Sequence, residues 1–216
     1  MYVIWDWNGT LLDDTSAALN ALNVILTRRN LRPLSLAEYR ETFAFPTVKF
    51  YESLGIELND DISREFHEAY YSFPAKLNSE ANAAVKYLAE KGIGQSILSA
   101  LRQDHLEKDV RHYFGDSPQN QKGDCPHFDH IVGSDNLDGG TKFERGQSLL
   151  KTLKSEGLSP EDIVMVGDAI HDKEVADALG VKCLLVSVGG HAHHRLAAIA
   201  QAHSSLLSAV HSLCLA

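Results

Sequence analysis

The stretch IWDWNGTLLDD, residues 4–14, decides how the chain is read. The apolar, β-favouring residues 2–7 predict a buried strand, which ends at the turn-forming pair Asn8-Gly9. Asp6 and Asn8 are two residues apart, so their side chains point to the same face of an extended backbone. The strand therefore ends in a carboxylate and an amide on one face, with Thr10 following in the turn.

The composition limits the class of protein. Of the 216 residues, 44% are hydrophobic and 23% are charged, as in an ordinary globular domain that carries at most a small insertion. No apolar run approaches the ~18 residues of a membrane span, and the chain begins at once with a strand pattern. We therefore expect no membrane segment and no secretory signal. A formal net charge of −9 argues against a nucleic-acid-binding surface.

The cysteines indicate a compartment. Cys125, Cys183 and Cys214 are odd in number and widely spaced. This pattern favours reduced thiols over a disulfide framework, so we expect a cytoplasmic protein. The sequence leaves open whether it is a monomer or a homodimer.

After residue 14 the spacing of the hydrophobic residues changes from that of a strand to that of helices. Residues 16–30 have helical spacing, with Thr15 or Ser16 as the expected cap, and residues 34–73 read as short aromatic-rich helices without a strand. From Ser79, another expected cap, helices alternate with apolar strands at 94–99, 130–134, 162–168 and 181–188, and the remainder reads as helical. This alternation predicts an α/β fold: a Rossmann-like, doubly wound parallel sheet with a small α-helical cap inserted after the first strand.

Polar residues stand at or just after the ends of these strands. Parallel strands bring their carboxyl ends to one edge of a sheet, where binding sites form. We therefore expect convergence of residues that are far apart in the chain, namely Asp6, Asn8, Thr10, Ser99, Lys142, Asp168 and Asp172.

The segments DWNGTLLDD, ILSA, Lys142 and VGDAIHD resemble, in order, the four motifs of the haloacid dehalogenase (HAD) superfamily, over almost the whole chain. The helical insertion resembles the cap of its phosphoglycolate phosphatase-like and β-phosphoglucomutase-like branch. The resemblance implies a core domain of residues 1–13 and 79–216 and a cap domain of residues 14–78. It also implies a phosphatase that hydrolyses a small phosphate monoester, of the phosphoglycolate or sugar-phosphate type, through an aspartyl-phosphate.

The resemblance also implies a role for each motif residue. Asp6 is the nucleophile and a Mg²⁺ ligand, Asp168 binds the same ion, and Asp172 lies beside it directly or through water. Ser99, Ala100 and Lys142 hold the phosphoryl group, and Thr10 fixes the first loop. These residue types suit the chemistry, because a carboxylate can attack phosphorus and Mg²⁺ prefers oxygen ligands.

Asn8 departs from the pattern, since the family's phosphatases have an aspartate there that protonates the leaving group and activates water. Asn8 retains the backbone carbonyl that binds Mg²⁺, but it cannot transfer a proton, a contribution of ~10²–10⁴ in rate. The sequence therefore leaves two functions open: a slow phosphatase, or an inactive phosphate-binding or regulatory protein. A haloacid dehalogenase is less favoured. On sequence grounds alone, Asn8→Asp is expected to raise turnover.

Several other residues carry weaker hypotheses. Arg145 competes with Lys142 for the phosphate, and Arg102 is a candidate for a substrate anion. His67 and Glu68 are candidates for proton donation in the cap. Two segments could bind a metal, HAHH at 191–194 and CPHFDH at 125–130. The simpler interpretation is that the first begins a helix and the second lies in a loop.

Overall fold

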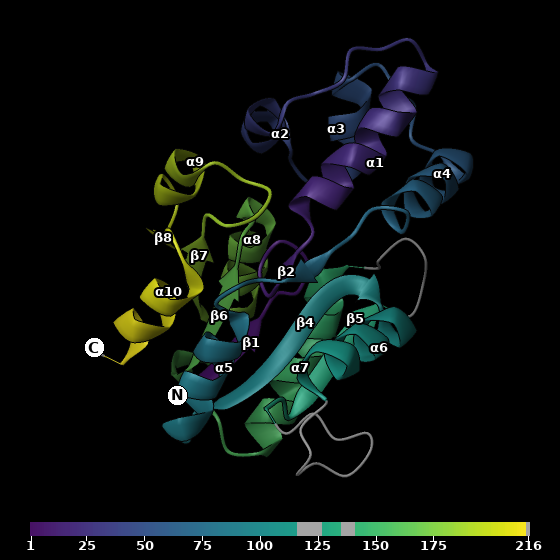
Figure 1. Cartoon of the computed structure of the whole chain (residues 1–216). Helices are drawn as coiled ribbons and strands as arrows, with labels where there is room; N and C mark the ends of the chain where they lie inside the picture. The colour runs from purple at the N-terminus through teal and green to yellow at the C-terminus, as the bar shows by residue number, and fades with distance from the viewer. Residues whose placement is uncertain (116–126, 135–140, 215–216) are drawn as a thin grey trace.

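The computed structural model describes residues 1–115, 127–134 and 141–214, and its centre is a six-stranded sheet of order β5-β4-β1-β6-β7-β8 (Figure 1). Every neighbouring pair in this sheet is parallel. The strands are β1 (Tyr2–Trp5), β4 (Gly94–Arg102), β5 (His130–Ser134), β6 (Ile163–Gly167), β7 (Lys182–Val186) and β8 (Gln201–His203).

Successive apolar side chains of a strand point to opposite faces of the sheet, and helices cover both faces. Val3 and Trp5 pack with helices α5 (Ala81–Glu90), α6 (Gln103–Phe114) and α10 (Leu206–Leu213). Tyr2 and Ile4 pack on the opposite face with α7 (Lys142–Ser155) and α8 (Ile170–Leu179). The doubly wound α/β fold predicted from the sequence is confirmed. The short helices η1 (Pro160–Asp162) and α9 (His193–Ala197) complete this part.

Four helices lie between β2 (Leu12–Asp13) and β3 (Lys76–Leu77), which pair antiparallel where the chain leaves and re-enters the sheet region. They are α1 (Thr15–Arg28), α2 (Leu36–Thr42), α3 (Thr47–Ser53) and α4 (Asp60–Tyr70), and we call them the cap helices. Their apolar residues form a cluster of their own around Leu22, Ile25 and Phe50. Figure 1 shows them above one end of the sheet. The domain limits at 13/14 and 78/79 stay a prediction.

Several local expectations were wrong. Neither Thr15 nor Ser16 caps α1, which begins after Asp14, and the Asp14 side chain makes no cap bond. Ser79 does not cap α5, whose N-cap is Glu80; the Glu80 carboxylate accepts instead from the backbone of Leu207 at 2.9 Å. The chain after β7 is not all helical, because β8 adds a sixth strand.

None of the helices in the described part of the chain has the length and apolar character needed to cross a bilayer.

Candidate active site

Asp6 follows β1 directly, and its backbone N–H donates to Val166 O at 2.8 Å, so β6 fixes where the carboxylate stands. Thr10 is fully buried in the turn. Its Oγ1 lies 3.2 Å from Asp6 Oδ2 and 3.4 Å from Asp168 Oδ1. The hydroxyl has one proton and can donate to one of the two carboxylates at a time. The loop-fixing role of Thr10 stays a prediction.

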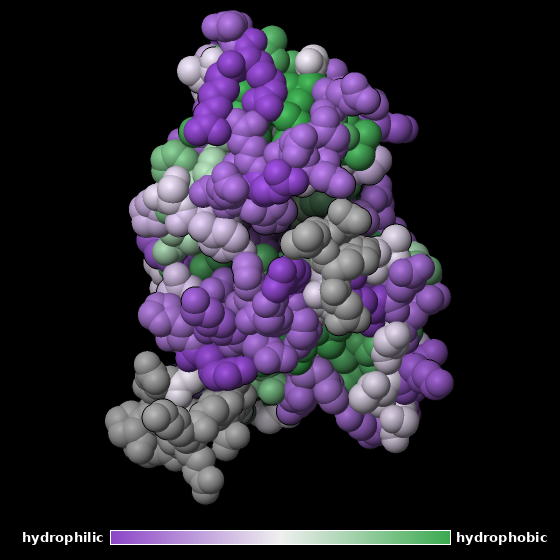
Figure 2. Space-filling view, turned by 90° about the vertical axis from the view of Figure 1, so that its right-hand side faces the viewer, coloured by the Kyte–Doolittle hydropathy of each residue, from purple (hydrophilic) through white to green (hydrophobic). Residues whose placement is uncertain are grey.

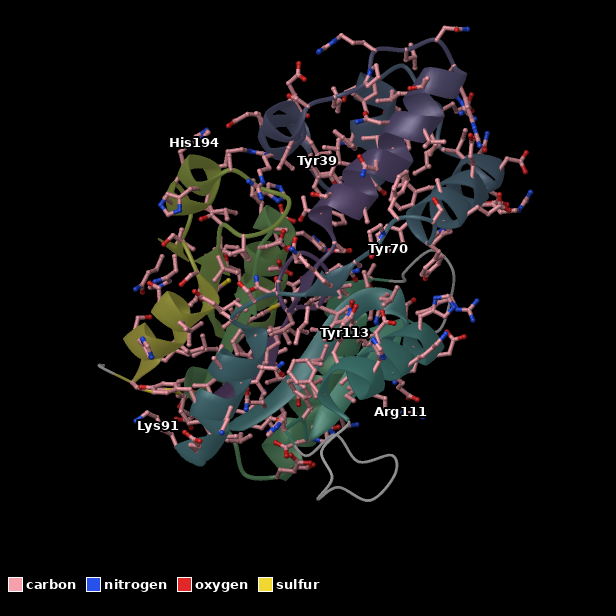
Figure 3. All side chains as sticks on the ribbon, viewed as in Figure 1. Tyr39, Tyr70, Lys91, Arg111, Tyr113 and His194 are labelled. Carbon is pink, nitrogen blue, oxygen red and sulfur yellow. The ribbon has the colours of Figure 1, made fainter. Side chains whose placement is uncertain are left out.

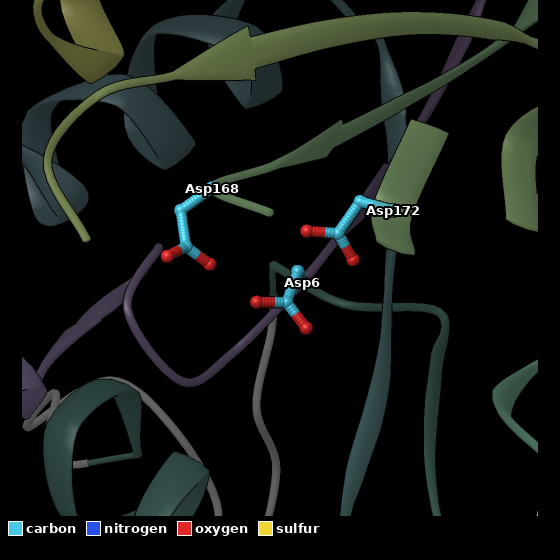
Figure 4. A group of neighbouring side chains, drawn as sticks. All are labelled: Asp6, Asp168 and Asp172. Carbon is cyan, nitrogen blue, oxygen red and sulfur yellow. The ribbon is translucent and has the colours of Figure 1, made fainter. Parts of the chain in front are cut away.

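Asp6, Asp168 and Asp172 converge as the sequence predicted. One carboxylate oxygen of each lies within 4.8 Å of the others, and the three side chains point toward a common centre (Figure 4). All three are buried. Burial raises the pKa of Asp6 to about 7, with Lys142 opposing and Asp172 reinforcing the shift. Burial and the charges of Asp6 and Asp172 raise the pKa of Asp168 well above its usual range.

This donor set fits a hard divalent cation. Three buried carboxylates face one ammonium group, so the cluster carries more negative than positive charge once all three carboxylates are ionised. Oxygen ligands and uncompensated negative charge are what Mg²⁺ requires. The backbone of Gly9 also packs closely against Asp168. Gly9 has φ +75°, and a Cβ there would lie 2.6 Å from Asp168 Oδ2. Gly190 N–H donates to the same oxygen at 2.6 Å, a contact that sequence reasoning missed.

Lys142, and not Arg145, joins the acidic cluster. Lys142 Nζ donates to Asp6 Oδ1 at 2.5 Å and to Asp172 Oδ1 at 2.7 Å. Burial alone would lower the pKa of Lys142, but Asp172 and Asp6 raise it above its usual range, so the ammonium stays charged. Arg145 donates through Nη2 to Ser99 O at 3.1 Å and thereby supports the neighbouring strand end.

Ser99 lies within β4 and not at its end, because β4 extends to Arg102 through an irregularity in register between Leu98 and Arg102. Such bulges redirect side chains at sites. The buried Ser99 Oγ accepts from Leu101 N–H at 3.0 Å and lies 3.4 Å from Asn8 Oδ1. The exposed Ala100 follows it, and both line the same cavity as the carboxylates.

The Asn8 amide binds a carboxylate, Asp14, to which the sequence analysis gave no role in the site. Asn8 Nδ2 donates to Asp14 Oδ2 at 2.8 Å, and Gly9 N–H donates to Asp14 Oδ1 at 2.7 Å. Tyr70 of α4 adds its hydroxyl to Asp14 Oδ2 at 2.6 Å. Burial raises the pKa of Asp14, although these three donors oppose the shift. An ionised carboxylate only accepts hydrogen bonds, so Asp14 orients the side-chain Nδ2 group of Asn8 toward itself. The Asn8 Oδ1 atom therefore faces Ser99.

Comparison with known proteins decides the family. The family model described as haloacid dehalogenase-like hydrolase matches residues 3–186, and all seven converging residues lie in that range. The chain belongs to the haloacid dehalogenase-like hydrolases.

The hydrolase is similar to proteins that carry different names. The "Putative pyrophosphatase PpaX" of Clostridium perfringens is 22% identical over 196 residues, covering 83% of this chain and 80% of that protein. A 5′-nucleotidase of Pseudomonas aeruginosa is 41% identical over 63 residues, 29% of this chain and 28% of that protein. A predicted phosphatase structure from Clostridium acetobutylicum has a TM-score of 0.73 at 19% identity, covering 100% of this chain and 98% of that one. At that identity the likeness shows the fold alone.

The cap helices and the sheet edge together line a cavity of about 600 Å³ above the hydrolase site. Its floor carries the carboxylate cluster with Asn8, Ser99 and Lys142, and its walls carry cap aromatics, among them Tyr39 and Tyr70. Figure 3 shows Tyr70 near the end of α4 that approaches the sheet.

The weaker candidates fall outside the cluster. Among the described residues, the acidic trio is the metal-ligating group that the geometry brings together. His191 is buried against Phe43, and His194 pairs with Glu41. Arg102 pairs with Asp104, and neither Arg102 nor Glu68 is among the cavity residues, whereas His67 is. Cys125 lies outside the described residues.

Proposed function

We propose that this hydrolase cleaves a small phosphate monoester with Mg²⁺ as cofactor, through an aspartyl-phosphate on Asp6. One observation supports the proposal above the others: Asp6 stands at the floor of a cavity, within 4.8 Å of two further buried carboxylates and hydrogen-bonded to a buried lysine. That arrangement combines a nucleophile, a cation site and a donor for phosphoryl oxygens.

In this proposal Asp6, Asp168 and the backbone carbonyl of Asn8 hold the cation. Both oxygens of Asp172 already accept protein donors, Lys142 Nζ at 2.7 Å and Ala169 N–H at 2.9 Å, which favours contact through water. When bound, Mg²⁺ supplies charge neutralisation for the phosphoryl group and for the carboxylates themselves.

The residues of the chain carry the two chemical steps. One Asp6 oxygen attacks phosphorus, the ester P–O bond breaks, and the leaving alkoxide takes a proton from solvent water. Lys142 and Ser99 hold the phosphoryl oxygens as charge develops on them. Water then cleaves the aspartyl-phosphate and releases phosphate. Asn8 can orient groups through its amide but has no proton to transfer, so we expect modest turnover.

Asn8 also favours a second candidate, a protein that binds phosphate without hydrolysing it. A haloacid dehalogenase is less favoured, because a cluster of three carboxylates is suited to a cation that such an enzyme does not need. Phosphoglycolate and sugar phosphates are the substrate types that the resemblance suggested. A cytoplasmic location, a small phosphorylated partner, no nucleic acid or membrane partner and a monomeric or homodimeric state belong to the same proposal.

The test measures phosphate released from a panel of phosphate monoesters with Mg²⁺, with EDTA, and by the Asp6→Asn variant. We expect release only from the unmodified protein with Mg²⁺. Release no higher than that of Asp6→Asn would leave the binding protein as the better account, and equal release in EDTA would favour a metal-independent enzyme.

A further inference from the structure

The cavity is larger than a phosphoglycolate-sized substrate needs. Its volume of about 600 Å³ lies within the ~300–1,000 Å³ of pockets that enclose drug-sized ligands. The phosphoryl group is expected at the floor, beside Asp6 and Lys142. The remaining space lies between the cap helices and must receive the leaving group of the ester.

The charges in this space disfavour a second anionic group. Among the described residues that line the cavity, Lys142 is the one lysine or arginine, and Asp6 and Asp172 already engage it. Asp14 and Asp60 line the cavity as well and add negative charge. A substrate carboxylate held there lacks a cationic partner, and burial of an unpaired charge is costly.

The two histidines of the cavity add no permanent cation, and each engages its own helix through Nδ1. His67 Nδ1 lies 2.6 Å from Ser63 O, and His171 Nδ1 lies 3.2 Å from Glu174 Oε2. The space above the phosphate site therefore favours an uncharged group.

Aromatic rings form the walls of that space. Phe43 and Phe45, which follow α2, pack edge to face with ring centroids 5.3 Å apart, and Phe45 stacks on His171 at 4.8 Å and 27°. Phe66 and Tyr70 of α4 stack at 6.0 Å and 21°. Phe45 and Tyr71 stay 40% and 52% exposed although they line the cavity, so part of each side chain remains accessible to a ligand. Figure 2 shows hydrophobic surface among hydrophilic residues in the part formed by the cap helices.

We propose that the substrate is a phosphate monoester whose leaving alcohol carries an uncharged planar aromatic ring, as in a nucleoside monophosphate or an aryl-bearing ester. This inference rests on the proposed phosphatase function and names its substrate class. The ring packs against the aromatic walls, which bind flat π-systems with little demand for specific hydrogen bonds. The class excludes phosphoglycolate, whose leaving group bears a carboxylate.

Matched substrates test the proposal. Adenosine 5′-monophosphate and ribose 5-phosphate share the ester and the pentose and differ by the base. Benzyl phosphate and cyclohexylmethyl phosphate share a primary alcohol and differ in planarity. We expect kcat/KM to be roughly tenfold or more higher for the aromatic member of at least one pair, and phosphoglycolate to be poorest. A preference confined to one pair identifies the source of the ring, whereas no preference in either pair, or a preference for phosphoglycolate, overturns the inference.

A binding measurement keeps the inference testable if turnover fails. Titration calorimetry of Asp6→Asn with Mg²⁺ compares adenosine 5′-monophosphate with ribose 5-phosphate, and benzyl with cyclohexylmethyl phosphate. Tighter binding of an aromatic member by roughly tenfold supports the substrate class even if no phosphate is released, which would count against the phosphatase proposal alone. Equal affinities within both pairs overturn the class while leaving hydrolysis a separate question.

Two variants of equal exposure locate the preference. Phe45 is 40% exposed at the cavity, and Ile199 is 41% exposed but does not line it. We expect Phe45→Ala to reduce the aromatic preference several-fold and Ile199→Ala to leave it unchanged. A preference that survives in Phe45→Ala and in Tyr71→Ala would show that these walls do not bind the ring.

Discussion

The half-buried Asn8 and the buried Asp14 form an amide–carboxylate pair, with Asn8 Nδ2 2.8 Å from Asp14 Oδ2. Position 8, where the resemblance to the superfamily's phosphatases implies an acid/base aspartate, thus faces the Asp14 carboxylate here, which Gly9 and Tyr70 also bind. An amide can donate to that carboxylate, whereas an ionised aspartate at position 8 would repel it. The amide at position 8 and the carboxylate at position 14 therefore support each other.

This pair reverses the expectation for Asn8→Asp. The new carboxylate would stand against Asp14 and remove the hydrogen bond, so we predict a loss of about 2 kcal/mol in the free energy of unfolding and no gain in turnover. Urea unfolding at pH 8 and phosphate release measure the two effects. A rise in turnover with unchanged stability would show that Asp14 does not constrain position 8.

Exchanging the two residues provides the matched control. In Asn8→Asp with Asp14→Asn, an amide again faces a carboxylate, so we predict that the double variant recovers most of the stability lost by Asn8→Asp. With a carboxylate now at position 8, turnover should exceed that of the unmodified protein by about tenfold or more. Effects of the two substitutions that merely add would contradict a coupled pair.

Tyr70 ties the cap helices to this pair through its bond to Asp14. Tyr70→Phe removes a hydrogen bond to a buried carboxylate, and we predict a loss of about 1.5–3 kcal/mol in stability with a higher KM. Tyr113→Phe is the control, because it removes a bond to a backbone carbonyl, Ala75 O at 3.2 Å, away from Asp14. Equal effects of the two variants on KM would argue against a special role for Tyr70.

Lys142 balances two buried carboxylates, and its removal leaves Asp6 and Asp172 without their cation. We predict that Lys142→Met destabilises the metal-free protein by about 3–5 kcal/mol and lowers turnover by ~10²-fold or more. Lys151→Met, an exposed position on the same helix, serves as the control. Thermal unfolding and phosphate release are the measurements, and similar behaviour of the two variants would contradict the prediction.

The raised pKa values of Asp6 and Asp168 predict a pH dependence for the metal-free protein. Burial moves the Asp6 pKa from its ordinary value of 3.8 to about 7, and Asp168 shifts the same way. The folded state therefore holds more protons than the unfolded chain, and stability falls as the pH rises from about 4 through 7. Melting temperatures in EDTA should fall over this range, and Mg²⁺ should raise them more at pH 8 than at pH 5. A metal effect independent of pH would contradict the assignment.

Regular features of the sequence predicted the sheet and the acidic cluster. Alternating strand and helix patterns indicated parallel strands, and parallel strands carry their carboxyl ends to one edge. That rule brings Asp6 and Asp168 together although 162 residues separate them, and the structure agrees. The small strands β2, β3 and β8 were missed, because two or three residues show no alternation to detect.

The role of Asp14 could not be predicted, because its partner Tyr70 lies in another element, 56 residues away. Locally, an aspartate before a helix reads as a hinge or cap residue. A second aspartate directly after Asp13, combined with an amide at position 8, was the one available signal. Likewise, the Glu80 carboxylate accepts a hydrogen bond from the backbone N–H of Leu207, which is distant in sequence, and no local sequence pattern predicts that contact.

Acid-quenched mass spectrometry of the peptide that contains residues 4–14, after brief mixing with a phosphate monoester and Mg²⁺, tests the central claim most directly. Nucleophilic attack by Asp6 predicts a phosphoryl group on Asp6 that appears before free phosphate and is absent from Asp6→Asn. Phosphate released at the normal rate while Asp6 stays unmodified, or undiminished release by Asp6→Asn, would contradict the account.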